Sequence, residues 1–390
     1  MRPLTLTPFV FASALLAAGL LAPASASAQG SLTPPGAPAE TMRSLDQIEP
    51  RTPINATTTP GNASALFIIS TAGSYYLTGN VTGVTGKAGI AITVNDVTID
   101  LGGFTMTGVA GATSAISFTN VDRIHIRNGR VRNWPAAGIN GNGGDGARLD
   151  NVVCEANGAQ GALLGMNAVV THSFFRNNTG ATGTGLQVDN GSVVTHCTSR
   201  GNALHGFAIG NDCEVSDCTA LTNGGNGFNF FSACRLQGCT ATSNTGAGFS
   251  GLSLAPILVH CMARTNTGSG FEVGSDAIIT QCTSHQNAHG FTCGSGTMIT
   301  GCVSSTNSPG SSTATAGAGF RVTGVTARLE GNTSRGNNRG YETTVTSVLL
   351  IRNLADTNVT NYSLTGSGSG ALVTAANVAT NTNPHANFDF

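Results

Sequence analysis

Three titratable residues recur at a regular interval in the middle of the chain. His172 and His196 are 24 residues apart, and Asp217 follows 21 residues later. Arg176 and Arg200 each stand four residues after one of the two histidines. A histidine beside an aspartate can act as an acid–base pair, and arginine forks bind carboxylate groups. These five residues are the candidate catalytic residues; the alternative interpretation is a solvated polar turn.

Ten cysteines form a second group with chemical potential, and six of them recur about every 21 residues: Cys197, Cys218, Cys239, Cys261, Cys282 and Cys302. An even count is compatible with disulfides. Equivalent residues in neighbouring strands, however, lie about 4.8 Å apart, whereas a disulfide needs Cβ atoms about 3.8 Å apart. We therefore predict buried, unpaired thiols in this ladder and leave a disulfide between Cys213 and Cys234 open. The spacing is not that of a zinc site, so no metal is predicted.

These residues belong to a repeat of about 22 residues. The units that begin at Cys197, Cys218 and Cys239 align without gaps, with an asparagine five residues later and Gly-Phe nine and ten residues later. Weaker copies lie on both sides, and they carry Gly102, Gly129, Val152, Ser173, Asn332 and Asn353 at the cysteine position. The chain thus contains about twelve units.

Each unit is too short to fold alone. Apolar, small and aromatic residues at fixed positions alternate with polar ones, which indicates two or three short strands, and the asparagine stands in a polar Asn/Gly/Thr cluster typical of a turn. Such units bury their apolar side only by stacking on one another. We predict an all-β protein, a parallel β-helix with phenylalanine, cysteine and aliphatic ladders inside and asparagines that bond to one another along the stack. A leucine-rich-repeat solenoid is disfavoured because each unit has a single aliphatic residue and no helical stretch.

The two ends of the chain differ from the repeat. Arg2, an apolar stretch at residues 9–21 and Ala26-Ser27-Ala28 are typical of a secretory signal, so we expect a secreted, periplasmic or extracellular protein without a transmembrane segment. The predicted parts are a signal peptide (1–28), a Pro/Thr/Ala-rich linker (29–60), an N-terminal β cap (61–88), the β-helix (89–365) and a C-terminal cap or tail (366–390).

Composition limits the partners. Only 9% of the residues are charged, and 18 Lys and Arg against 19 Asp and Glu give a net charge of −1. A groove for nucleic acid needs clustered basic residues, so no nucleic-acid partner is predicted, and the sequence indicates no cofactor.

The repeat over residues of about 88–365 resembles secreted right-handed parallel β-helix proteins of pectate-lyase-like architecture. The segments 32–38, 48–54 and 73–79 are similar to those of a bacterial subgroup with no assigned activity. The resemblance implies a single-stranded right-handed parallel β-helix of about twelve coils. Pectate lyases of this architecture use calcium-binding aspartates with an arginine, polygalacturonases several aspartates with Gly-His-Gly, and alginate epimerases Asp-Pro-His-Asp. None of these motifs is present, and the nearest acidic group, Asp212, Glu214 and Asp217, stands on one coil.

We therefore predict a non-catalytic module, either structural or binding an extracellular polysaccharide or cell-surface glycan. The alternative is a polysaccharide lyase or glycoside hydrolase that acts on an acidic polysaccharide. An enzyme of this kind should gather carboxylates or arginines from at least three coils beside a concave face.

Overall fold

The computed structural model describes residues 50–308, 317–366 and 368–390, all of which lie in one compact unit, Pro50–Phe390. The predicted signal peptide and residues 29–49 of the predicted linker lie outside the described residues. Within the described part of the chain, no helix has the length and hydrophobicity that a bilayer crossing requires.

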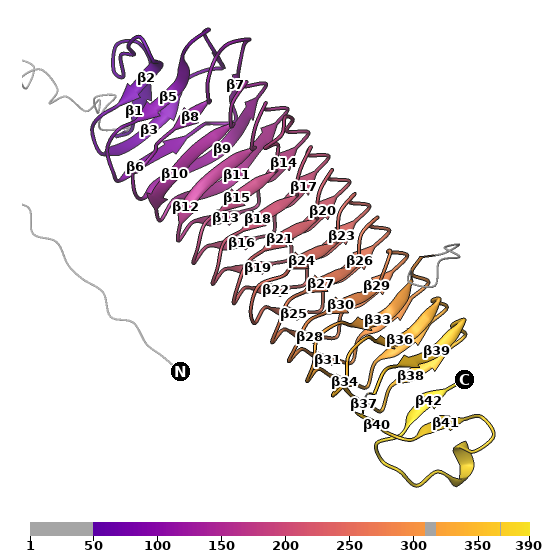
Figure 1. Ribbon diagram of the computed structural model, residues 1–390. Coiled ribbons are helices and arrows are strands. Elements are labelled where there is room, and N and C mark those ends of the chain that lie inside the picture. Colours follow the sequence, from indigo (N-terminus) through magenta and orange to yellow (C-terminus); the bar gives the residue numbers. More distant parts are fainter. Residues whose placement is uncertain (1–49, 309–316, 367) are drawn as a thin grey trace, which may run out of the picture. The chain divides into compact units, whose positions relative to one another are not determined.

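The unit is a stack of coils whose short strands pair in parallel with those of the next coil (Figure 1). One coil contains β16 (Val193–Thr195), β17 (Thr198–Arg200) and β18 (Phe207–Ile209). Their partners in the next coil are β19 (Glu214–Ser216), β20 (Thr219–Leu221) and β21 (Phe228–Phe230). The first two strands of each coil belong to one sheet, called sheet A here, and the third to a second sheet, called sheet B. Because the pairing is in register, the same position of the repeat stacks on itself.

Each coil contributes one strand to sheet B, so the strands of this sheet give the number of coils. Its fourteen strands among the described residues are β2 (Ala65–Ile69), β5 (Ala88–Ile92), β8 (Ile116–Ser117), β10 (Ile139–Asp145), β12 (Ala162–Met166), β15 (Leu186–Val188), β18, β21, β24 (Phe249–Gly251), β27 (Phe271–Val273), β30 (Phe291–Cys293), β33 (Ala318–Val322), β36 (Arg339–Thr343) and β39 (Thr360–Leu364). The predicted all-β parallel helix is confirmed, with about fourteen coils instead of twelve. The two additional coils contain β2 and β5, which lack the cysteine and the Gly-Phe pair of the repeat but join the same ladder, as Phe67 pairs with Ile90 and Ile90 with Ile116. Phe67 thus stands in the phenylalanine register.

A continuous stack of aromatic rings fills the interior behind sheet B. Successive ring centroids lie 4.7 to 5.1 Å apart, and the rings are nearly parallel; they belong to Phe207, Phe228, Phe249, Phe271, Phe291, Phe320, Tyr341 and Tyr362. Phe228 and Phe249 are fully buried, as the register of the repeat predicts.

The ladder cysteines lie at the bend between the first two strands of their coils. All ten cysteines of the chain are free and buried, and the backbone N–H of Cys197 donates to Sγ of Cys218 over 3.4 Å. Burial raises the pKa of Cys239 well above its ordinary value and the pKa of Cys293 to about 12. The prediction of unpaired ladder thiols is confirmed, and Cys213 and Cys234 are also unpaired.

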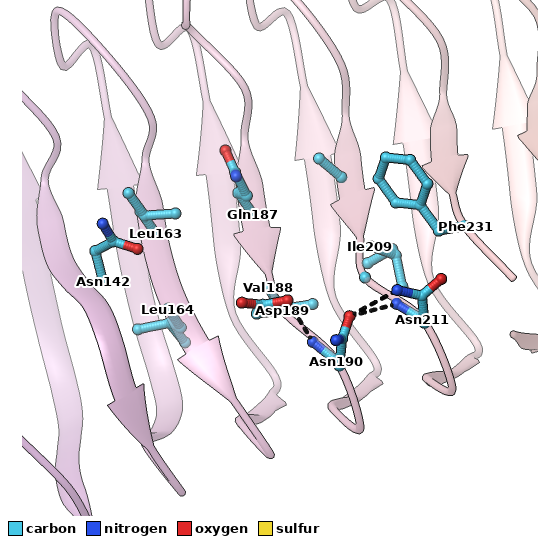
Figure 2. Close-up of a pocket in the computed structure, with 12 residues that line it drawn as sticks. Asn142, Leu163, Leu164, Gln187, Val188, Asp189, Asn190, Ile209, Asn211 and Phe231 are labelled. Atoms are coloured by element: carbon cyan, nitrogen blue, oxygen red, sulfur yellow. Dashed lines mark hydrogen bonds between the residues drawn. The ribbon is translucent and has the colours of Figure 1, made fainter. Parts of the chain in front are cut away.

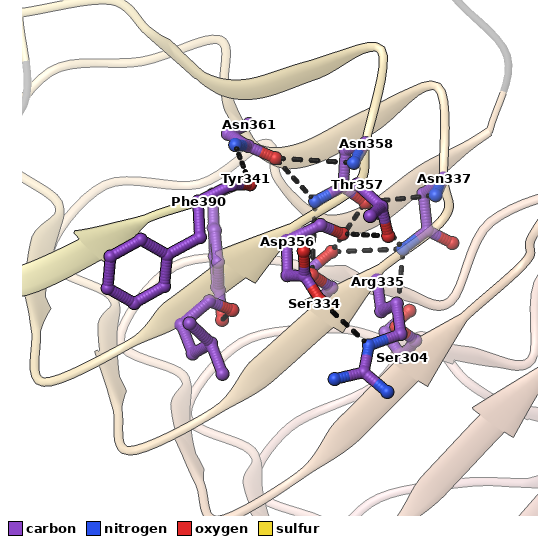
Figure 3. Close-up of polar contacts among 11 residues, drawn as sticks. Ser304, Ser334, Arg335, Asn337, Tyr341, Asp356, Thr357, Asn358, Asn361 and Phe390 are labelled. Carbon is purple, nitrogen blue, oxygen red and sulfur yellow. Dashed lines mark hydrogen bonds and ion pairs between the residues drawn. The ribbon is translucent and has the colours of Figure 1, made fainter. Parts of the chain in front are cut away.

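A ladder of buried asparagines holds the turn that precedes sheet B. Asn244 is typical: its Nδ2 donates to Oδ1 of Asn266 (2.9 Å) and to the carbonyl of Ala220 (3.2 Å). Figure 3 shows the C-terminal end of this ladder, where the N–H of Asn337 donates to Oδ1 of Asn358 (2.9 Å). Buried polar groups are costly unless hydrogen-bonded, so the predicted bonding between turn asparagines is confirmed and explains why the repeat keeps this residue.

Short strands cover both ends of sheet A. At the N-terminal end, β1 (Thr52–Ile54) pairs with β3 (Gly73–Leu77), so the last part of the predicted linker is an ordered strand. The Pro/Thr/Ala-rich composition gave no sign of this strand, because a segment of only three residues is enough to pair with the open edge of a sheet. At the C-terminal end, β42 (Asn387–Asp389) pairs with β38 (Leu354–Asp356).

Candidate functional site

His172, His196 and Asp217 stand at the same bend of three successive coils. Their φ angles are +49°, +53° and +53°, and the whole column shares this left-handed conformation, including Asn128, Asn151, Gly238, His260, Gln281, Gly301, Gly331 and Arg352. Asparagine, aspartate and histidine are several-fold enriched in this region among non-glycine residues. The backbone of the bend therefore accounts for these residue types without any catalytic role.

The contacts within this column are long and open to solvent. The rings of His172 and His196 stack at 5.2 Å, and Nε2 of His196 lies 3.9 Å from Oδ2 of Asp217. Nδ1 of His172 lies 3.5 Å from Oδ1 of Asp150, a neighbour that the repeat pattern did not single out. Both histidine side chains are more than half exposed. The column is a hydrated surface stripe rather than an enclosed acid–base site.

Arg176 and Arg200 lie away from the histidines. They occupy the far ends of β14 (Phe174–Arg176) and β17, four residues along the chain, which at the rise of a strand is about 13 Å. The structure therefore divides the five candidate residues into two groups, a bend column with His172, His196 and Asp217 and a strand-end column with the two arginines.

The strand-end column continues into earlier coils. Arg200 pairs in register with Arg176, Arg176 with Glu155 of β11 (Arg148–Glu155), and Glu155 with Arg132 of β9 (Ile124–Arg132). Arg130 and Phe174 lie two residues earlier on their strands and share the outer face. We call these six residues the arginine patch: Arg130, Arg132, Glu155, Phe174, Arg176 and Arg200. Four arginines and one glutamate give the patch a net charge of +3.

Ion pairing within the arginine patch is uneven. The Glu155 carboxylate accepts from Nη1 of Arg130 (3.1 Å) and from Nε of Arg176 (2.7 Å), and the Arg176 guanidinium lies 5.8 Å from the centroid of the Phe174 ring. Arg132 and Arg200 are exposed and form no ion pair with any residue that the structure describes. Nε of Arg132 donates to Oγ1 of Thr107 (3.4 Å), so its two Nη groups and the Arg200 guanidinium are available to an external anion.

Sequence reasoning predicted part of this patch. Arg176 and Arg200 are two of the candidate residues that the sequence indicates, and the structure stacks them in register beyond Glu155. Arg130, Arg132 and Phe174 were missed. The available signal was their alternation with the buried residues Val131 and Phe175, which directs their side chains outward.

No metal centre accompanies these groups. Among the described residues, no three His, Cys, Asp or Glu side chains lie close enough together to hold a metal ion. The nearest acidic group in the sequence, Asp212, Glu214 and Asp217, likewise does not come close enough together to hold a metal ion.

Comparison with known proteins identifies the class of fold. A family model described as a right-handed beta helix region matches residues 114–261. No curated protein sequence matches the chain.

Several solved structures are similar to this chain at low sequence identity. The A-module of the mannuronan C-5 epimerase AlgE4 of Azotobacter vinelandii is 13% identical with a TM-score of 0.47, and the match covers 77% of this chain and 91% of that one. The corresponding AlgE6 module is 13% identical with a TM-score of 0.48, over 82% and 90% of the two chains. The endo-xylogalacturonan hydrolase of Aspergillus tubingensis is 11% identical with a TM-score of 0.37, over 79% and 93%.

The fold assignment depends on the strand register and the family match rather than on these distant likenesses. The in-register parallel ladders give the architecture, and the family match spans the coils that carry the arginine patch from Arg130 to Arg200. The chain is a right-handed parallel β-helix protein.

Proposed function

We propose that this protein is a non-catalytic module that binds an acidic polysaccharide through the arginine patch, outside the cytoplasm or at a cell surface. The observation that carries the proposal is the exposure of Arg132 and Arg200 on either side of the Glu155–Arg176 pair, without a carboxylate partner among the described residues. A guanidinium fork binds carboxylate and sulfate groups in a bidentate way.

The geometry of the arginine patch suits an extended polyanion. Coils are about 4.8 Å apart, so Arg132 and Arg200 are about 14 Å apart along the axis, with Arg176 between them. A chain that lies along the axis therefore meets a guanidinium on three of four coils. The half-buried ring of Phe174 adds an apolar surface against which the face of a sugar ring can pack.

The patch lacks the pair of carboxyl groups that hydrolysis of a glycosidic bond usually requires. A glycoside hydrolase usually needs two carboxyl groups on either side of the scissile bond, and the patch contains only Glu155, whose carboxylate is held by two arginines. A hydrolase at this place would therefore need a second carboxyl group from outside the patch.

Binding assays on paired variants test the proposal. Arg264, at the end of β26 (Met262–Arg264), provides the matched control, because it occupies the same column and is exposed, three coils beyond Arg200. With polygalacturonate as the probe at low ionic strength, the R132A/R200A variant should bind about tenfold more weakly than wild type, whereas R264A should bind as wild type does. Added salt should weaken wild-type binding, because exposed charges are screened.

Two results would overturn the proposal. One is equal binding by R132A/R200A and wild type. The other is release of new reducing ends or unsaturated uronate products from the polymer by the wild-type protein, which would favour the enzyme alternative.

A further inference from the structure

Sheet B carries a hollow on its outer face that is separate from the arginine patch (Figure 2). Its volume is about 340 Å³, and its lining extends from Asn142 of β10 to Phe231, directly after β21. The lining thus spans five successive coils, or about 19 Å along the axis at the spacing of paired strands. An elongated ligand fits this shape better than a compact one.

A glycine, Gly210, forms part of the floor of the hollow. Because Val188, Ile209 and Phe230 pair in register, the residues that follow them, Asp189, Gly210 and Phe231, occupy equivalent positions on three coils. A Cβ atom at Gly210 would lie 2.6 Å from the backbone nitrogen of Asn190, so no larger residue fits there. The backbones of the two coils therefore approach closely at Gly210, and the floor of the hollow carries no side chain at this position between Asp189 and Phe231.

The lining combines apolar surface with hydrogen-bonding groups. Phe231, which is 52% exposed, lies at one side, and Asn142 and Leu163 lie at the other, with Gln187 and Asp189 between them (Figure 2). Oε1 of Gln187 accepts from Gln160 (3.2 Å), which leaves its amide NH₂ for a ligand.

Internal hydrogen bonds fix the polar edge of the hollow. Asp189 uses Oδ1 to accept the N–H of Asn190 (2.8 Å), which leaves Oδ2 as an acceptor. Oδ1 of Asn190 in turn accepts the backbone N–H (2.8 Å) and the side-chain amide (3.0 Å) of Asn211. The turn is therefore held in place before a ligand arrives, which lowers the ordering cost of binding.

Charge decides the class of ligand. Asp189 is the single charged residue among those that line the hollow, so an anionic saccharide would meet repulsion there. We propose that the hollow binds a neutral oligosaccharide, whose ring faces pack on Phe231 and Leu163 and whose hydroxyl groups bond to Gln187, Asp189 and Asn142. This proposal is independent of the arginine patch.

The test uses the full chain and a panel of neutral hexasaccharides from cellulose, mannan, xylan and chitin, with binding measured by calorimetry. At least one of them should bind, and Phe231→Ala should weaken that binding by about tenfold or more. Leu252→Ala is the matched control, because Leu252 is an exposed apolar residue (68%) on the next coil that does not line the hollow. R132A/R200A should bind the neutral sugar as wild type does.

Gln187→Ala provides a second variant in case Phe231→Ala does not fold, and it too should weaken binding. The proposal is overturned if no neutral hexasaccharide binds, if Leu252→Ala weakens binding as much as Phe231→Ala, or if both hollow variants bind as wild type does. If the hollow instead docks a protein, the exposed side chains of Phe231 and Leu252 would both contribute to that surface. The oligosaccharide assays would then give one of these negative results.

Discussion

Arg176 lies one coil beyond Glu155, and its Nε donates to Oε2 of the glutamate over 2.7 Å. One coil further, Arg200 occupies the same position of the repeat and has no carboxylate within reach among the described residues. The same repeat position is therefore used in one coil to hold a charge pair and in the next to present a charge to solvent. This contrast separates the structural charges of the stack from those that can bind a ligand.

The aromatic stack predicts that replacing two different phenylalanines will have very different effects on stability. Phe249→Ala removes a fully buried ring and should cost about 3–5 kcal/mol through lost burial and the cavity left behind. Phe231→Ala removes an exposed ring and should cost less than about 1 kcal/mol. Urea unfolding of both variants measures the difference, and equal midpoints would show that the Phe249 ring does not support the core.

The buried thiols should be protected in the folded protein. Because all ten cysteines are free and buried, and the thiolate is the reactive form, a maleimide reagent should modify few of them under native conditions and all of them after denaturation. Mass spectrometry of the labelled protein counts the adducts. Disulfide-linked peptides containing any of Cys197, Cys218, Cys239, Cys261, Cys282 or Cys302 would contradict the ladder geometry.

His289 should make the fold sensitive to acid. Its Nδ1 accepts the N–H of Ala318 (3.2 Å), and burial, with the nearby Arg321 and Arg339, lowers its pKa from 6.5 to about 4. The unfolded chain therefore binds the proton first as the pH falls. Stability should be complete above pH 6.5, decrease as the pH falls towards about 4, and change little from this group below that.

His289→Asn is the matched variant for this titration. Asn226 occupies the equivalent position two residues before its coil's Phe228 and accepts the N–H of Ala247 with Oδ1 (2.9 Å), so asparagine keeps the hydrogen bond without titrating. Unfolding midpoints measured across this pH range should fall less steeply for the variant. Identical pH profiles would mean that protonation of His289 does not limit stability.

The bend column should tolerate substitution. Asparagine already occupies this bend at Asn151, so His196→Asn should leave stability and polysaccharide binding unchanged, whereas His196→Ala should cost about 1 kcal/mol because alanine is strained in the left-handed region. Thermal unfolding and the polygalacturonate assay check both variants. If wild type cleaves the polymer and His196→Asn does not, the bend column is a catalytic site.

Much of the fold could be predicted because three markers repeat. The cysteine, asparagine and Gly-Phe positions stack on themselves, so one register explains the buried Cys218, Asn223 and Phe228 together. The coils of β2 and β5 carry neither the cysteine nor the Gly-Phe pair; parallel pairing, visible in the structure, adds them to the stack and places Phe67 in the phenylalanine register.

The surface sites were harder to predict for two physical reasons. The arginine patch includes side chains from a coil that has Gly129 instead of a cysteine, so the repeat position that Arg132 shares with Arg200 was not recognised from the sequence. The hollow includes a close approach of two coils at Gly210, and such an approach becomes visible only after the coils are placed against each other. The consecutive aromatics Phe230 and Phe231 were the available signal, because alternation in a strand sends one of them outward.

The most direct test of the central claim is a crystal structure of the protein with a galacturonate hexasaccharide. We expect an intact oligosaccharide along the coil axis, with carboxylates within hydrogen-bond distance of the guanidinium groups of Arg132 and Arg200. A cleaved sugar, or one bound at His172 and His196 with the arginine patch empty, would contradict it.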